Sequence, residues 1–211
     1  MLSGEGLRLV YGEGQTQVHV LNEVSLSIGE REFVGIIGPS GSGKSSLLYV
    51  LAGLKEPTAG TVRFRDVELG RLRMDERAAL RKREFGFVFQ SPFLIGYLTT
   101  LENVLAADPS RRQRAEELLE ELGIAHCQDK FPHQLSMGER QRVATARALV
   151  HKPAVIFADE PTASLDRANA ELAIAALRKY SSEGALFVVT HDESILKGSD
   201  RILQMRGGKF E

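Results

Sequence analysis

One glycine-rich loop, residues 38–45, constrains the fold of this chain more than any other part of its sequence. It reads GPSGSGKS and fits the pattern G-x-x-x-x-G-K-[ST] at every fixed position. The apolar run 33–37 leads into the loop, and the helix-like segment 46–51 leads out of it. Strand, glycine turn and helix start therefore follow one another in the order that a phosphate-binding loop requires. The sequence predicts a site for a nucleoside phosphate.

Size and charge limit the classes of protein that remain. The 211 residues can bury one large core, or a core with a subdomain, and 43% hydrophobic with 26% charged residues is ordinary for a globular protein. With 27 basic and 28 acidic residues, the chain lacks the positive surplus that attracts a duplex nucleic acid. We therefore expect no nucleic acid partner.

Cysteine usage and hydropathy indicate a cytoplasmic protein. The single cysteine, Cys127, excludes an internal disulfide, fits a reducing compartment and is interpreted as a packing or surface thiol. No apolar stretch approaches the roughly 18 residues needed to cross a bilayer. The first residues, MLSGEGLRLV, lack the basic start and apolar core of a signal peptide. If the protein serves a membrane process, we expect another chain to supply the membrane part.

Apolar patterns predict a core built mainly of strands. Residues 7–11 and 18–28 alternate apolar and polar side chains on either side of a turn at 12–15, which predicts an antiparallel sheet. Continuous apolar runs predict three further strands, buried and parallel: 85–89, 154–158 and 185–189.

A long helical insertion is expected between the strands at 85–89 and 154–158, and it includes helices at 111–122 and 138–150. The first of these reads RRQRAEELLEEL, with its charges in the reverse of the order that the helix dipole favours. Its leucines at 118, 119 and 122 share one face. We interpret it as a solvated helix on a packing stripe rather than as a charged binding surface.

Residues suited to phosphate chemistry follow the predicted core strands. Four strand ends carry them: Gly38, Gln90, Asp159 with Glu160, and His191. The carboxyl ends of parallel strands meet at one edge of a sheet, where ligands bind. The sequence therefore predicts that these segments converge on one crevice.

The glycine-rich loop is expected to bind phosphates through its backbone N–H groups and the positive end of the following helix. Lys44 should reach the β- and γ-phosphates, and the Ser45 hydroxyl should hold Mg²⁺. The residues expected to line this cradle are Gly38, Pro39, Ser40, Gly41, Ser42, Gly43, Lys44, Ser45 and Ser46.

Roles for the remaining polar residues follow from their charge. Asp159 ends a strand and can hold Mg²⁺ opposite Ser45, while Glu160 is free to orient or polarise an attacking water. The alternative for this pair is two carboxylates that open a helix. Gln90 is expected to contact the metal or the water. His191 is either a contact to a γ-phosphate or a core histidine.

A second helix start, LSMGE at 135–139, has two readings. Ser136 is a natural N-cap, and this alone explains a serine there. The same geometry presents N–H groups to an anion, so Ser136 and Gly138 could grip a nucleotide bound to a second copy of the chain.

Together these segments resemble the ABC-type ATPases over essentially the whole chain. GPSGSGKS, Gln90, LSMGERQ, VIFADE, the segment ASLD at 163–166 and His191 occur in the order of that family. The resemblance implies an α/β fold: a P-loop NTPase (RecA-like) core with a mainly parallel sheet, an N-terminal antiparallel β subdomain and an inserted α-helical subdomain. The implied domain comprises a nucleotide-binding core, 1–90 and 153–211, and the helical subdomain, 91–152.

The resemblance also implies ATP hydrolysis in a head-to-tail dimer. ATP and Mg²⁺ would be the cofactors, with Tyr11 stacked on adenine and with Asp166, in the segment that resembles the family's D-loop, among the nucleotide-binding residues. The alternative for Tyr11 is a core tyrosine on a strand face. Closure on ATP would drive an integral-membrane permease, and the chain would contact the membrane, at its inner face, only through that partner.

Further sequence segments indicate a subgroup within the family. VLNEVSL, LENV and GERQRVATARALVHKP resemble the lipoprotein-release and macrolide-export ATP-binding subunits, and the cell-division ATPase of the same branch, which activates an extracytoplasmic enzyme, stays open. Met137 departs from the family by replacing the first glycine of its LSGGQ/E signature.

The apolar segment 91–98 is expected either to dock a permease helix or to pack on the helical insertion. DNA-repair or translation ATPases and small-molecule kinases fit these features less well.

Overall fold

The computed structural model describes residues 1–12, 16–163 and 165–211. The chain folds into two compact units, one made of residues 1–81 and 187–211, the other of residues 82–186. The division falls inside helix α2 (Met74–Glu84) and strand β8 (Ala185–Thr190). Within the described ranges, every helix is too short or too polar to span a bilayer.

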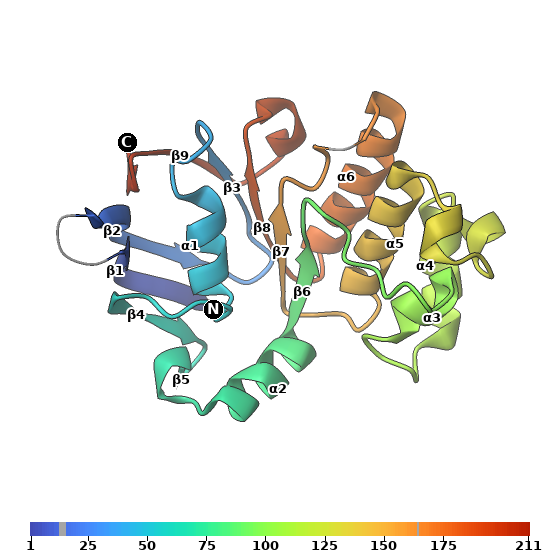
Figure 1. Ribbon diagram of the computed structural model, residues 1–211, viewed down its shortest axis with the longest axis horizontal. Coiled ribbons are helices and arrows are strands. Elements are labelled where there is room, and N and C mark those ends of the chain that lie inside the picture. Colours follow the sequence, from blue (N-terminus) through green and yellow to red (C-terminus); the bar gives the residue numbers. More distant parts are fainter. Residues whose placement is uncertain (13–15, 164) are drawn as a thin grey trace. The chain divides into compact units, whose positions relative to one another are not determined.

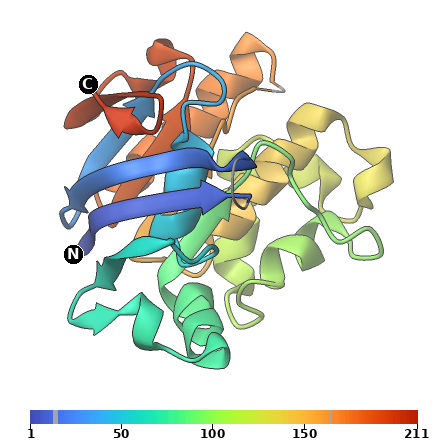
Figure 2. The same cartoon turned by 60° about the vertical axis from the view of Figure 1, so that its left-hand side comes forward.

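The first unit contains an antiparallel sheet in the strand order β2-β1-β4-β5. Its strands are β1 (Leu2–Tyr11), β2 (Val18–Ile28), β4 (Ala59–Phe64) and β5 (Val67–Glu68). β1 and β2 pair from Leu2 opposite Ile28 to Tyr11 opposite Val18, and Figure 2 shows them running side by side. The predicted antiparallel sheet is confirmed, with β1 beginning earlier than residue 7. The predicted turn at 12–15 lies largely outside the described residues.

The same unit contains strands of a second sheet in the order β10-β9-β3-β8. β3 (Phe33–Ile37) pairs in parallel with β9 (Arg201–Arg206), which pairs antiparallel with β10 (Lys209–Phe210). Helix α1 (Lys44–Leu51) follows β3 and packs against β1 and β2 (Figure 1). Its leucines at 47, 48 and 51 are fully buried, so the helix start is held in place by the core. The unit also contains the short helices η2 (Leu69–Arg71) and η5 (Glu193–Leu196).

The second unit pairs β6 (Phe85–Val88) in parallel with β7 (Val155–Asp159), from Phe85 opposite Val155 to Val88 opposite Ala158. All of β7 is buried, as a continuous apolar run predicts. Its helices are α3 (Thr100–Leu105), α4 (Arg112–Glu121), α5 (Met137–Leu149) and α6 (Arg167–Ser181), with the short helices η3 (Ala125–Cys127) and η4 (Pro132–Gln134). Helix α5 contacts α3, α4, α6 and β6 and forms the centre of this unit (Figure 1).

The helices differ in how clearly the apolar pattern of the sequence predicts them. α4 buries Leu118 and Leu119, and Leu122 beyond its end is also buried, which confirms the packing stripe. α6 was not predicted, although its buried positions Ala173, Ile174 and Leu177 have helical spacing. α2 was not predicted either, and it has only Leu80 buried, so no apolar stripe marks it.

The α4 stripe can be tested by cavity formation. Leu118→Ala should lower the free energy of unfolding by about 2–5 kcal/mol, because the side chain is 0% exposed and its removal leaves a cavity. Leu172→Ala, on α6, is the matched control: its leucine is 44% exposed and the change should stay within roughly 0.5 kcal/mol. Urea denaturation measures both, and equal losses would contradict the buried stripe.

Candidate functional site

The glycine-rich loop adopts a conformation that only glycine permits at two of its positions. Gly43, the N-cap of α1, has φ 103°, and a Cβ there would lie 2.6 Å from the Val20 carbonyl oxygen. A Cβ on Gly38 would overlap the carbonyl oxygen of Met205. The backbone of the loop is thus packed directly against neighbouring backbone, which explains why the motif requires glycine.

The start of α1 is left open to an anion. No side chain caps the helix, and its first turn carries no acidic residue. The N–H groups at a helix start have no intrahelical partners and form the positive end of the helix dipole. The position where a Cβ of Gly41 would lie has no atom within 4 Å among the described residues. This arrangement suits a phosphate group.

Lys44 completes the cradle. Its side chain is 6% exposed, and Nζ donates to the carbonyl oxygens of Gly38, at 2.7 Å, and Pro39, at 3.0 Å. The ammonium group is therefore held inside the curve of the loop. Ser42 Oγ is also buried and has no hydrogen-bond partner within the described part of the chain. A buried ammonium and a buried hydroxyl without a partner are costly in an apolar core, whereas a bound phosphate would accept hydrogen bonds from both.

Tyr11 ends β1 with its ring exposed, and Lys55 Nζ lies 3.9 Å from the ring centroid. This is a cation–π contact. A ring that is 42% exposed is not a core side chain, so the alternative of a core tyrosine is excluded. Lys55 was not predicted, because nothing in its local sequence singles it out.

His191 follows the buried strand β8 and is exposed, which excludes a core histidine. β8 lies beside β3 in the strand order, so His191 and the glycine-rich loop follow neighbouring strands. The next residue, Asp192, caps η5 by accepting a hydrogen bond from the Ser194 N–H at 2.9 Å.

In the second unit the structure brings Gln90 and the Asp159–Glu160 pair to the same edge. β6 and β7 are parallel and in register up to Val88 and Ala158, so the residues after each strand emerge side by side. Asp159 is the last residue of β7 and is 5% exposed, whereas Gln90 is exposed. Convergence of these two segments is thus confirmed within this unit.

Glu160 does not open a helix. Its φ is 47°, and the next helix, α6, begins at Arg167 with Asp166 as its N-cap. The alternative of two helix-opening carboxylates is therefore wrong. A non-glycine residue in the left-handed region is strained, and such strain is concentrated at functional sites.

Helix α5 holds the segment that follows β6. Gln141 Nε2 donates to the Phe89 carbonyl at 2.8 Å. Arg147 donates to the carbonyls of Phe93, at 2.8 Å, and Pro92, at 2.7 Å. Burial lowers the pKa of Arg147 from its ordinary value. Neither side chain was predicted to contact this segment, because the partners are some fifty residues apart in sequence.

Asn103 holds the rest of the segment. Its Oδ1 accepts from the Ile95 N–H at 2.7 Å, and Nδ2 donates to the carbonyls of Ile95, Leu98 and Thr99 at 2.9–3.1 Å. Above this anchored backbone, Phe93 and Tyr97 are 68% and 80% exposed. Part of segment 91–98 therefore packs on the helical unit while two aromatic rings face outward.

Ser136 caps α5 in a capping box. Its Oγ accepts from the Glu139 N–H at 3.2 Å, and Glu139 Oε2 accepts from the Ser136 N–H at 2.7 Å. The N-cap interpretation is confirmed. Met137 is 47% exposed, and a Cβ on Gly138 would lie 3.2 Å from Asn169 Nδ2, so this position is tight for any larger residue.

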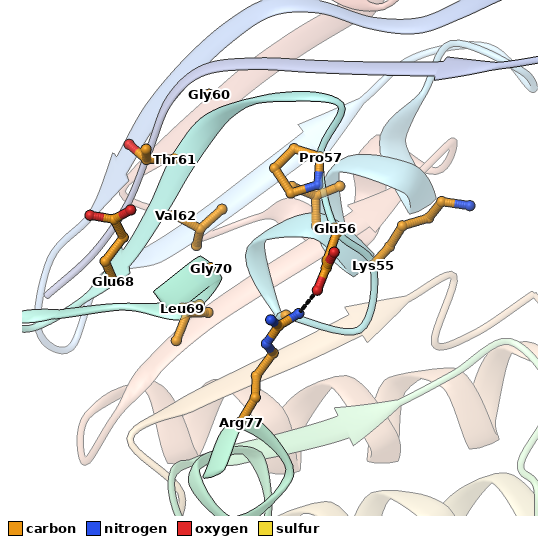
Figure 3. A pocket seen from close by; sticks show the side chains of 12 residues that line it. Lys55, Glu56, Pro57, Gly60, Thr61, Val62, Glu68, Leu69, Gly70 and Arg77 are labelled. Atoms are coloured by element: carbon orange, nitrogen blue, oxygen red, sulfur yellow. Dashed lines mark hydrogen bonds and ion pairs between the residues drawn. The ribbon is translucent and has the colours of Figure 1, made fainter. Parts of the chain in front are cut away.

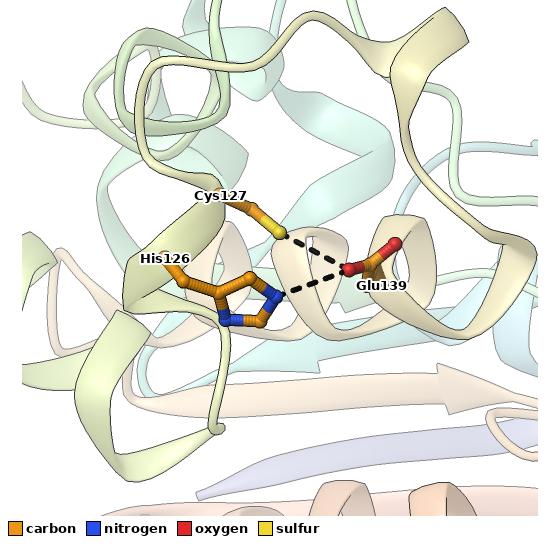
Figure 4. A group of neighbouring side chains, drawn as sticks. All are labelled: His126, Cys127 and Glu139. Carbon is orange, nitrogen blue, oxygen red and sulfur yellow. Dashed lines mark hydrogen bonds and ion pairs between the residues drawn. The ribbon is translucent and has the colours of Figure 1, made fainter.

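The other oxygen of Glu139 has two neighbours that were not predicted. Cys127 Sγ donates to Oε1 at 3.1 Å, and His126 Nε2 lies 3.4 Å from the same atom (Figure 4). Hydrogen bonds from the Cys127 thiol and from the Ser136 N–H lower the pKa of Glu139 to about 2. Cys127 is buried, and burial followed by the nearby Glu139 carboxylate raises the pKa of its thiol.

Asp166 lies at the start of α6. Its two carboxylate oxygens accept hydrogen bonds from the Asn169 N–H at 2.9 Å and the Asn169 side-chain amide at 2.6 Å. These bonds lower the pKa of Asp166. Ser164, in the same predicted loop, lies outside the described residues.

A small cavity in the first unit is lined by Lys55 but by none of the predicted site residues. Its volume is about 50 Å³, room for one or two water molecules. Its lining includes Leu69, Val62 and the ion pair of Arg77 with Glu56, at 2.7 Å (Figure 3). None of the predicted site residues lines it, so it is not the nucleotide site.

The comparisons with known proteins decide the family. A family model described as ABC transporter matches residues 21–163. The chain belongs to the ABC transporter family. It is 42% identical to the lipoprotein-releasing system ATP-binding protein LolD of Bordetella pertussis, over 100% of this chain and 95% of that protein.

Two further relatives agree. The macrolide export ATP-binding/permease protein MacB of Neisseria meningitidis is 38% identical over the whole of this chain, which spans 34% of that longer protein. The solved structure of the ATP-binding cassette MJ0796, a dimer in a post-hydrolysis state bound to ADP and Pi, matches with a TM-score of 0.93 and 37% identity, over 100% of this chain and 97% of that chain.

The predicted family, subgroup, fold class and ATPase activity are thereby confirmed. This ABC transporter chain is an ATP-binding, ATP-hydrolysing cassette. The resemblance of VLNEVSL, LENV and GERQRVATARALVHKP pointed to the subgroup that the relatives represent.

Acid should weaken the capping box at the start of α5, the helix that carries the signature segment of this ABC ATPase. The pKa of Glu139 falls from 4.5 to about 2 on folding, so its carboxylate stabilises the native state above pH 4.5 and this stabilisation declines as the pH falls towards 2. The stability difference between wild type and Glu139→Gln, measured by urea denaturation, should therefore shrink from pH 4.5 downwards. Parallel pH profiles of the two proteins would contradict this.

Proposed function

We propose that this chain is the ATP-binding subunit of a transporter that works on lipid-anchored proteins, as the relative LolD does by its name. The observation that supports this most is the match to that relative, 42% identical and covering 95% of its length. The proposed partners are a separate integral-membrane permease and a second copy of this chain, and the proposed place is the inner face of the cell membrane.

The loop residues would hold the nucleotide. The open start of α1 and the enclosed Lys44 ammonium fit the β- and γ-phosphates, and the exposed ring of Tyr11 offers a stacking surface for adenine. ATP binding would displace Lys44 from the carbonyls of Gly38 and Pro39 towards the phosphates. Lys55 would leave the ring face that the base takes.

Mg²⁺ would be held by Ser45, Gln90 and Asp159. A hydroxyl, an amide and a carboxylate are oxygen ligands of the kind that this ion prefers. When bound, Mg²⁺ neutralises charge on the phosphate oxygens. The remaining roles belong to this chain: Glu160 would accept a proton from, or orient, the attacking water, and His191 would contact the γ-phosphate.

The signature segment would serve the nucleotide of a second copy. Ser136 and Gly138 stand at the start of α5, where N–H groups and the helix dipole attract an anion. Asp166 would lie at the same dimer interface. Met137 would stand beside the contact instead of glycine, and its exposure makes it a side chain that the second copy must accommodate.

The segment 91–98 would transmit the closure of the dimer on ATP to the permease. Its backbone is fixed by Arg147 and Asn103, and its exposed rings of Phe93 and Tyr97 offer apolar area to a helix of the partner. Gln141, on α5, donates a hydrogen bond to the Phe89 carbonyl, just before Gln90. A displacement of Gln90 when ATP binds or is hydrolysed would therefore also displace α5 and this segment.

The nucleotide site can be tested with two variants. Glu160→Gln should bind ATP but hydrolyse it at least about 100-fold more slowly, because it loses a general base, a group that contributes roughly 10²–10⁴-fold. It should therefore sediment as a closed dimer in the presence of ATP and Mg²⁺. Lys44→Ala is the control and should lose nucleotide binding and stay monomeric. A monomeric Glu160→Gln variant with saturating ATP would overturn the dimer.

The transport assignment needs the native complex. Purified through this chain and reconstituted in vesicles, the complex should contain a membrane protein and release a lipid-anchored protein when ATP is hydrolysed. ATP-driven movement of a macrolide without such release would overturn the assignment in favour of export. Activation of a partner enzyme without movement of either would overturn it in favour of the cell-division type.

A further inference from the structure

The cluster at the start of α5 contains three different metal-ligating groups at close range. The imidazole of His126, the thiol of Cys127 and the carboxylate of Glu139 each offer one ligand atom, and these atoms lie within 4.8 Å of one another (Figure 4). The first two come from η3 and the third from the first turn of α5. Two elements of the same unit thus present their ligands to one point.

We propose that His126, Cys127 and Glu139 form a binding site for a zinc ion, and none of the three is among the residues proposed to hold Mg²⁺. Thiolate, imidazole and carboxylate are the three ligand types that Zn²⁺ takes in proteins, whereas Mg²⁺ prefers oxygen alone. A protein site with three ligands leaves a fourth position for water.

The observed distances are close to those that the ion imposes. Tetrahedral zinc, with bonds of about 2.0–2.3 Å, holds its ligand atoms roughly 3.4–3.6 Å apart. Sγ and Oε1 are 3.1 Å apart, and Nε2 and Oε1 are 3.4 Å apart. Sγ and Oε1 would move apart by about 0.4 Å, and the His126 ring, whose side chain is 63% exposed, would approach the sulfur.

The charges allow the exchange of a proton for the ion. Zn²⁺ would form a bond to Sγ as the thiol proton leaves for the buffer, His126 would bind through the lone pair of neutral Nε2, and Glu139 is already a carboxylate. Lys130 is the cation that faces the thiol, and it would turn away to solvent.

Binding would act on the signature segment without breaking its cap. The ion uses Oε1 of Glu139, while Oε2 stays on the Ser136 N–H at 2.7 Å. The ion would therefore tie η3 to the first turn of α5 and stabilise the native state by an amount that grows with the logarithm of the free Zn²⁺ concentration divided by its Kd.

The test uses the full chain, freed of metal with a chelator. Titration with Co²⁺ should produce thiolate-to-cobalt charge-transfer absorption at one equivalent, and this band belongs to Cys127 because the chain has a single cysteine. Zn²⁺ should abolish the band, excess Mg²⁺ should not, and calorimetry should detect release of a proton. Zn²⁺ should also raise the melting temperature.

Variants separate a metal site from a hydrogen-bonded cap. Cys127→Ser should remove the band, and the exposed substitution His126→Ala should weaken Zn²⁺ binding at least about 10-fold, the lower end of what losing even an outer-shell partner costs. His133→Ala, an exposed histidine on η4 of the same unit, is the control and should bind like wild type. Absence of the band, or equal affinity in His126→Ala and wild type, would overturn the proposal and leave the cluster a cap. Neither result depends on the ATPase assignment.

Discussion

The first unit depends on one electrostatic constraint: no side chain caps the start of α1. Helices α3, α5 and α6 begin with Thr99, Ser136 and Asp166, and each of these side chains accepts a hydrogen bond from the first turn. Helix α1 begins at Lys44, after its N-cap Gly43, and like α4 it has no capping side chain and no acidic residue in its first turn. Its first N–H groups and the enclosed Lys44 ammonium therefore form a concentrated positive site, and burial of the helix by its leucines prevents it from moving away. An anion such as the triphosphate proposed above would satisfy this site.

The second unit depends on α5, which carries functional contacts on most of its sides. Near its start are Ser136 and Glu139; in its middle, Gln141 binds the backbone before Gln90; near its end, Arg147 binds the backbone of the exposed segment. Each of these contacts is a hydrogen bond between a side chain and a backbone group, so it fixes where the backbone lies. A rigid helix with both ends tied transmits displacement well, because a packed core shifts as a body.

Much of this could be predicted from residue order, and the exceptions have physical reasons. Buried strands at 85–89 and 154–158 were predicted because a parallel strand is apolar on both faces. The cap at Ser136 was predicted because local chemistry determines it. α2 could not be predicted, because only Leu80 is buried there. The contacts of Asn103, Arg147 and Lys55 could not be predicted either, since polar side chains without a local pattern acquire partners only when the chain has folded.

The sequence by itself determined the family, the phosphate loop and the order of the strands' polar ends, because each is written in residue types at short spacing. Only the tertiary structure decided the exposure of Tyr11 and His191, the left-handed backbone at Glu160, and the meeting of Cys127 and His126 with one oxygen of Glu139. The last two depend on the path of the chain after β7 and on the packing of η3 against α5. Such long-range packing is a property of the whole fold, and no local window of sequence encodes it.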